Sequence, residues 1–217
     1  MEMRSTGATE DVDALIVDLD GVIRHWHGDE FTALAESVGL SREDLGDIAF
    51  EPELLAAGMT GAVVFEDWAD EIGRRAGALH GCDPAAVTAG FIALGWTIDQ
   101  EVVDLIREVR AAGRVKVALF SNASTRLEAD LESCGLDAAF DVVFNSARLG
   151  LAKPDVEAFR TVANLLEVPV ERCLFIDDTR PNVEGARLAG MRAEPFTSVA
   201  DLRELLEEAG LLDAAAS

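Results

Sequence analysis

The sequence is poor in positive charge. Its 217 residues include 18 lysines and arginines against 41 aspartates and glutamates, which gives a formal net charge of −23. A surface with this charge repels the phosphate backbone of DNA and RNA. We therefore expect no nucleic-acid partner and interpret the excess acid as a solvated acidic surface.

Cysteines and long apolar segments are also scarce. Cys82, Cys134 and Cys173 lack disulfide-framework or zinc-site spacing, and an odd, sparse count is typical of a reducing compartment. The longest uncharged run, 84–98, has 15 residues, fewer than the ~18 needed to span a bilayer. Residues 1–13 are polar and acidic and do not resemble a signal peptide. These absences predict a soluble, cytoplasmic protein with no membrane partner, and they leave its oligomeric state open.

Lysine occurs only twice, at Lys116 and Lys153, whereas arginine occurs 16 times. Lys153 lies in the segment Gly150-Leu151-Ala152-Lys153-Pro154. An ammonium group is a compact point charge, unlike the planar guanidinium of arginine. Because the chain uses arginine for nearly every other cation, Lys153 is a candidate for a site that needs such a charge.

Apolar runs typical of buried parallel strands alternate with helical segments over most of the chain. Such runs cover 14–17, 115–120 and 173–176, and shorter strands are expected at 141–144 and 192–196. Between 29 and 95 the pattern is helical, and this stretch is too long for a loop in a compact domain. The sequence therefore predicts an α/β fold with a Rossmann-like core of residues 12–23 and 97–217, an inserted α-helical cap of residues 24–96, and a disordered tail of residues 1–11.

Acidic and hydroxyl side chains follow three of the predicted strands. Asp18-Leu19-Asp20-Gly21-Val22 follows the first, Phe120-Ser121-Asn122 ends the second, and Asp177-Asp178 closes the third. Ligands of open α/β sheets bind beyond the carboxyl ends of the strands, so we expect these side chains to share one crevice. Such a set suits Mg²⁺-assisted transfer of a phosphoryl group to an aspartate.

The individual motifs support this chemistry. Asp18 and Asp20 are two residues apart, so both carboxylates can project to the same side of a strand end. The hydroxyl of Ser121 and the backbone N–H groups beside it suit phosphoryl oxygens, although a Ser-Asn turn or a helix N-cap is the structural alternative. The ammonium group of Lys153 offsets negative charge that otherwise repels an anionic substrate.

The order and placement of these four motifs resemble the haloacid dehalogenase superfamily, in the branch of phosphatases with a helical cap after the first motif. The resemblance covers about Asp13 to Leu206. It implies a Mg²⁺-dependent phosphatase that hydrolyses a small phosphorylated metabolite through an aspartyl-phosphate. Sugar phosphates and phosphoglycolate are the first substrate candidates that this resemblance suggests.

The same resemblance implies a role for each matching residue. Asp18 is the nucleophile and Asp20 the acid/base, and an acid at this position favours phosphate esters over carbon–halogen bonds, because an alkoxide needs a proton when it leaves. The implied phosphate-binding residues are Ser121, Asn122 and Lys153. The implied Mg²⁺ ligands are Asp18, the main-chain carbonyl of Asp20, and Asp178, with Asp177 as a second ligand or a holder of metal-bound water. Asn182 is an accessory candidate that hydrogen-bonds a bound water or Lys153.

Two other functions fit part of the pattern. A phosphomutase like β-phosphoglucomutase shares all four motifs but returns the phosphoryl group to a sugar instead of to water. A phospho-acceptor signalling module also places acids, a hydroxyl and a lysine on a parallel sheet. That module needs its acid pair after the first strand and its acceptor after the third, and it has no helical insert, so the order of motifs here disfavours it.

The segment His25-Trp26-His27 follows the first motif and has three interpretations. Two histidines that face one way in an extended segment could bind a transition metal, but no third ligand is evident. The histidines could instead line the entrance of the site, or the segment could be a plain linker.

Overall fold

A parallel five-stranded sheet forms the centre of the computed structural model, which describes residues 11–213. Its strands are β1 (Ala14–Val17), β4 (Lys116–Ser121), β5 (Val142–Asn145), β6 (Cys173–Asp177) and β7 (Arg192–Pro195). They lie in the order β5-β4-β1-β6-β7, and all neighbours are parallel. The predicted α/β fold is confirmed. The predicted tail of residues 1–11 lies, except for Asp11, outside the described residues.

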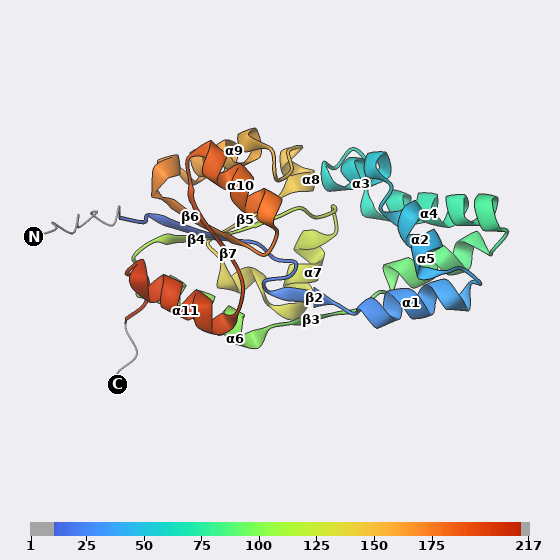
Figure 1. Ribbon diagram of the computed structural model, residues 1–217, viewed down its shortest axis with the longest axis horizontal. Coiled ribbons are helices and arrows are strands. Elements are labelled where there is room, and N and C mark those ends of the chain that lie inside the picture. Colours follow the sequence, from blue (N-terminus) through green and yellow to red (C-terminus); the bar gives the residue numbers. More distant parts are fainter. Residues whose placement is uncertain (1–10, 214–217) are drawn as a thin grey trace, which may run out of the picture.

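Helices cover both faces of this sheet (Figure 1). One face packs against α6 (Gln100–Ala112), α7 (Leu127–Cys134) and α11 (Val199–Glu208), and the other against α9 (Val156–Leu166) and α10 (Arg180–Ala189). Shorter elements are α8 (Ser146–Leu149) and the 3-10 turns Asp137–Ala139 and Val170–Arg172. In β1, Leu15 and Val17 face the first layer while Ala14 and Ile16 face the second. Because both faces are buried, the strand is apolar at every position.

Five further helices form a separate hydrophobic cluster beside the strand ends (Figure 1). They are α1 (Gly28–Ser37), α2 (Arg42–Ala49), α3 (Pro52–Met59), α4 (Phe65–His80) and α5 (Pro84–Ile92), which we call the cap helices. Leu45, Ile72 and Val87 are fully buried within this cluster. The amphipathic stripes of the sequence thus pack against one another and need no other layer to cover them.

A short antiparallel ladder connects the cap helices to the sheet. It pairs β2 (Arg24–Trp26) with β3 (Trp96–Ile98), so that Trp26 lies opposite Trp96. The ladder contains both boundaries of the predicted cap of residues 24–96. The division of the chain into a core and a cap at these residues stays our proposal.

Local capping explains where several helices begin. Ser41 and Asp44 form a reciprocal capping box at α2, and Asp83 caps α5. Helix α9 begins at Val156, because the side chain of Asp155 accepts a hydrogen bond from the backbone N–H of Glu157 and acts as the N-cap.

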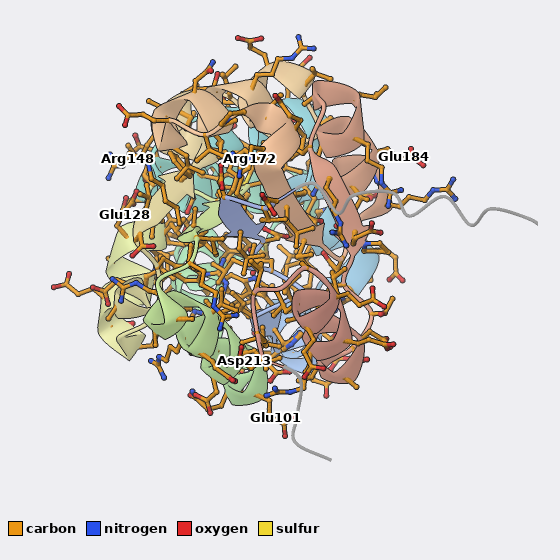
Figure 2. All side chains as sticks on the ribbon, turned by 90° about the vertical axis from the view of Figure 1, so that its left-hand side faces the viewer. Glu101, Glu128, Arg148, Arg172, Glu184 and Asp213 are labelled. Atoms are coloured by element: carbon orange, nitrogen blue, oxygen red, sulfur yellow. The ribbon has the colours of Figure 1, made fainter. Side chains whose placement is uncertain are left out.

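Charged side chains lie mostly on the outside of the molecule. Figure 2 looks onto the core and shows Glu101, Glu128 and Glu184 at its margin. Among the described residues, the buried charged side chains are Asp18, Arg24, Lys153 and Asp177. No helix in residues 11–213 is both long and apolar enough to cross a membrane. Because burying a charge is costly without a partner, the four buried charges direct attention to the strand ends.

Candidate active site

Three carboxylates converge where β1 and β6 end. The two strands are neighbours, and Val17 pairs with Ile176, so Asp18 and Asp177 leave the sheet at the same edge. One oxygen from each of Asp18, Asp177 and Asp178 lies within 4.8 Å of the others. This spacing allows the three carboxylates to share one cation.

Lys153 joins two of these acids. Its Nζ lies 2.7 Å from Asp18 Oδ1 and 2.7 Å from Asp177 Oδ2, and it donates a third bond of 3.0 Å to the Phe120 carbonyl. The side chain is only 1% exposed. All three ammonium hydrogens therefore have acceptors, which is what a buried cation requires.

Asn122 positions this lysine through its backbone. Its Nδ2 donates to the Lys153 carbonyl at 2.7 Å, and its Oδ1 accepts from the Lys153 N–H at 2.8 Å. The amide side chain is thus engaged by Lys153. Any part of Asn122 in phosphate binding falls to its backbone, and its side chain acts through Lys153.

The partners of Asp177 differ from those of Asp178. Asn182 Nδ2 donates to both Asp177 oxygens at 3.1 and 3.0 Å, and the Thr179 N–H adds a bond of 2.8 Å. Asn182 therefore contacts Asp177, whereas the sequence suggested a bound water or Lys153. Asp178 is exposed and accepts one bond, of 3.1 Å from the Thr179 hydroxyl. Of the two acids, Asp178 keeps more of its oxygen lone pairs free for a ligand.

The electrostatics of Asp18 set it apart from an ordinary aspartate. Burial raises the pKa of its carboxyl from 3.8 to about 7; the Lys153 charge opposes this rise and the Asp177 charge adds to it. The short contact with Lys153 favours the ionised form, but that lysine is shared with Asp177 and does not offset the loss of water. An additional cation beside Asp18 would bring this raised pKa down and keep the carboxylate ionised.

Ser121 ends β4, next to β1, with its hydroxyl inside the protein. The residue is 1% exposed, and its Oγ has no hydrogen-bond partner among the described residues. A buried hydroxyl left unpaired costs about 1–3 kcal/mol. An oxygen of a bound phosphoryl group would satisfy it, which agrees with the predicted phosphate-binding role.

Gly21 allows the loop after β1 to approach Asp178. Its φ is +86°, and a Cβ at this position would lie 2.1 Å from Asp178 Oδ2. The positive φ disfavours a side chain here, and a Cβ would force the Asp178 carboxylate to shift. Gly21 of the first motif therefore leaves the space that the Asp178 carboxylate of the fourth motif occupies.

Asp20 lies outside the acid cluster and faces the antiparallel ladder. Its carboxylate accepts bonds from Arg24 Nε at 2.7 Å, Arg24 Nη2 at 2.8 Å and Trp26 Nε1 at 2.7 Å. Sequence reasoning did not single out Arg24 or the indole of Trp26. The available signal was their spacing: residues two apart on a strand share a face, and this face is turned to Asp20. The predicted metal contact through the Asp20 main chain stays a prediction.

The two histidines of the ladder have different surroundings. His25 is exposed, whereas His27 Nδ1 lies 2.9 Å from Glu30 Oε1 and the residue lines a cavity next to Asp20. Within residues 11–213, the only group of side chains with metal-ligand spacing consists of aspartates. Of the three interpretations of the segment, the geometry favours the entrance of the site, and for His27 alone.

Fold and site together define an α/β enzyme with an acid cluster and a buried lysine at the carboxyl edge of its sheet. The chain belongs to the haloacid dehalogenase-like hydrolase family, whose model matches residues 12–190. The recognition made from the four motifs is confirmed, and so is the prediction of a hydrolase.

Individual relatives agree with this assignment. A phosphatase of Mycobacterium tuberculosis is 42% identical over 90 residues, which are 41% of this chain and 41% of that protein, so the alignment spans about two fifths of the relative. A sesquiterpene phosphatase of Aspergillus oryzae is 28% identical over 202 residues, covering 91% and 96% of the two chains. A family enzyme of Bacteroides thetaiotaomicron, solved with magnesium and inorganic phosphate, superposes with a TM-score of 0.70 at 18% identity over 86% of this chain and 94% of that one. This last similarity concerns the fold alone.

Proposed function

We propose that the protein is a Mg²⁺-dependent phosphatase that hydrolyses a small phosphorylated metabolite through an aspartyl-phosphate on Asp18. The observation that carries this proposal is the placement of Asp18 against Lys153 and beside Asp177 and Asp178, with the unpartnered Ser121 hydroxyl at the same sheet edge. The phosphatases among the relatives support the same activity.

In the first step, an oxygen of Asp18 attacks the phosphorus and the bond to the leaving alcohol oxygen breaks. Asp20 enters this step in its protonated form and donates the proton to that oxygen; the proton that it takes from water in the second step restores this form. In the second step, Asp20 takes a proton from water, the water oxygen bonds to phosphorus, and the aspartyl-phosphate bond breaks to return Asp18 as a carboxylate. Lys153 and Ser121 stabilise the phosphoryl oxygens in both steps.

The side chain of Asp20 must rotate before it can act as the acid. Its two oxygens accept three hydrogen bonds from Arg24 and Trp26. Rotation away from the ladder releases it toward the leaving oxygen. We infer that the structure describes Asp20 in its resting orientation.

The donor set fits Mg²⁺. The cluster holds three carboxylates and one ammonium group, which contacts two of them, so it has an excess of negative charge before any phosphate arrives. Mg²⁺ held by these residues would neutralise this charge and that of the phosphoryl oxygens. Asp18 and Asp178 are the direct ligands in this proposal, because Asp177 already has hydrogen-bond donors on both oxygens. Asp177 then serves as a weaker ligand or holds a metal-bound water.

The test is phosphate release from a panel of phosphate monoesters, with Mg²⁺ and with excess chelator. We expect release with Mg²⁺, none with chelator, and none from Asp18→Asn. Asp47→Asn, which alters an exposed acid of α2, is the control and should keep its activity. Isomerised hexose phosphate in place of free phosphate would identify a phosphomutase. Full activity of Asp18→Asn would contradict the proposed nucleophile.

A further inference from the structure

A cavity of about 330 Å³ lies between the cap helices and the core, next to Asp20. Asp20 and Asn122 line its core side. Most of its wall is aromatic or aliphatic, and the main contributors are Phe31, Leu55, Met59, Phe65, Trp68 and Phe91. The volume falls within the ~300–1,000 Å³ that is typical of small-molecule sites. The cavity therefore offers an apolar chamber where the leaving group of a phosphate ester would lie.

Each arginine around this chamber donates at least one hydrogen bond to a protein group. Arg42 donates to the Gly28 carbonyl at 2.9 Å, and Arg126 donates to Asp130 at 2.8 Å. Trp68 Nε1 is the one buried side-chain donor of the wall that has no partner in residues 11–213. The wall thus offers a ligand mainly apolar surface.

We propose that this cavity binds the alcohol part of the substrate and that this alcohol is apolar, as in a long-chain alkyl, prenyl or aryl phosphate. The proposal rests on the phosphatase function proposed above. With phosphorus at Asp18 and the leaving oxygen at Asp20, the rest of the alcohol extends into the chamber that Asp20 lines.

A sugar phosphate fits this chamber poorly. Each hydroxyl that enters loses hydrogen bonds to water, and a mainly apolar wall returns few of them. A hydrocarbon chain gains from the same transfer, because its apolar surface leaves water. The chamber therefore selects against the sugar phosphates and phosphoglycolate that the family resemblance suggests first.

The test compares kcat/KM for ethyl, butyl, hexyl and octyl phosphate with that for glucose 6-phosphate, all with Mg²⁺ and below the aggregation concentration of the esters. We expect kcat/KM to rise about two- to fourfold for each methylene that enters the chamber. Octyl phosphate should be the best substrate of the series and glucose 6-phosphate worse than butyl phosphate. A flat series, or a preference for the sugar ester, would overturn the proposal.

A pair of variants ties this preference to the chamber. Leu55→Gln puts an amide into the wall and should lower kcat/KM for octyl phosphate about tenfold, while that for ethyl phosphate stays within about twofold. Leu79→Gln is the matched control, because Leu79 lies on α4 and is 70% exposed outside the chamber. Equal losses in the two variants would contradict the assignment.

A binding measurement separates this inference from the catalytic one. Trp26 and Trp68 line the chamber, so 1-octanol should change the tryptophan fluorescence of the wild type, and less so that of Leu55→Gln, even with chelator. Octanol binding without phosphate release from any ester would refute the phosphatase and support the apolar chamber. Phosphate release without octanol binding or chain-length dependence would support the phosphatase and refute the chamber's assignment.

Discussion

Replacing the proposed nucleophile should stabilise the metal-free protein. Burial raises the pKa of Asp18 from 3.8 to about 7, and at about 1.4 kcal/mol per pKa unit this rise corresponds to a cost of about 4 kcal/mol for holding the ionised group in the fold. In Asp18→Asn the charge is absent, and Lys153 keeps Asp177 as its partner at 2.7 Å. The new amide lacks ideal partners, which reduces the expected gain at pH 8 to about 2 kcal/mol.

The gain should depend on pH in a defined direction. An acid whose pKa is higher in the folded state than in the unfolded state does not lower the free energy of unfolding below the unfolded pKa. As the pH rises from the unfolded pKa to the folded pKa, this acid lowers the free energy of unfolding progressively. The wild type therefore loses stability between about pH 4 and about pH 7 relative to Asp18→Asn, and the loss is constant above that range. Between pH 5 and pH 8, the difference between the two proteins should grow by about 2–3 kcal/mol, whatever the amide itself costs.

The measurement is urea unfolding with excess chelator at both pH values, followed by tryptophan fluorescence. Asp177→Asn is the matched comparison. It replaces an acid that accepts bonds from Lys153, Asn182 and the Thr179 N–H, so it should destabilise the fold. If the stability difference between Asp18→Asn and wild type is the same at pH 5 and pH 8, the electrostatic account of Asp18 is wrong.

Two further substitutions test how the site is positioned. Gly21→Ala should weaken Mg²⁺ binding in calorimetry at least about tenfold, because the new methyl group displaces Asp178. Gly113→Ala is the control: Gly113 also has a positive φ, but nothing lies within 4 Å of its new Cβ, so Mg²⁺ binding should be unchanged. Asn122→Ala removes both hydrogen bonds that hold the Lys153 backbone. Turnover should therefore fall about tenfold, while the free energy of unfolding falls by only about 1 kcal/mol. A loss of stability without a loss of turnover would show that Asn122 does not position Lys153.

The strands and the charged end of the site were predictable from the sequence for one physical reason. Parallel strands buried on both faces are apolar throughout, so the first polar residues after each run mark its carboxyl end. In the structure Val17 pairs with both Leu119 and Ile176, which brings the residues after all three strands to one edge. The sequence pattern therefore predicts the position of these residues in space, because the parallel pairing of the strands brings their carboxyl ends together.

The surroundings of Asp20 could not be predicted in the same way. Arg24 reaches its carboxylate through the turn after β1, in which the Gly21 N–H donates to the Arg24 carbonyl, and β2 then pairs with β3, which joins segments on either side of the cap helices. The apolar chamber could not be predicted from the sequence either. Phe65 and Trp68 belong to a stripe that predicts a buried helix face, and such a stripe is the same whether its side chains fill the space completely or leave a cavity between helices.

Charge and apolar surface are separated within this site, and Asp20 lies at the junction. In the proposed mechanism, the acids, Lys153 and Ser121 act where charge changes during phosphoryl transfer, so their interactions strengthen in the transition state and raise kcat. The chamber, as we propose it, contacts a part of the ester that does not react, so its contribution is nearly equal before and during the reaction and affects which ester binds. The cap helices can therefore change the substrate with little effect on the chemistry, provided that Asp20 still reaches the leaving oxygen. Because Asp20 is held by Arg24 and Trp26 of β2, the strand that leads directly into α1, the position of the cap helices and the orientation of the acid are coupled through this short ladder.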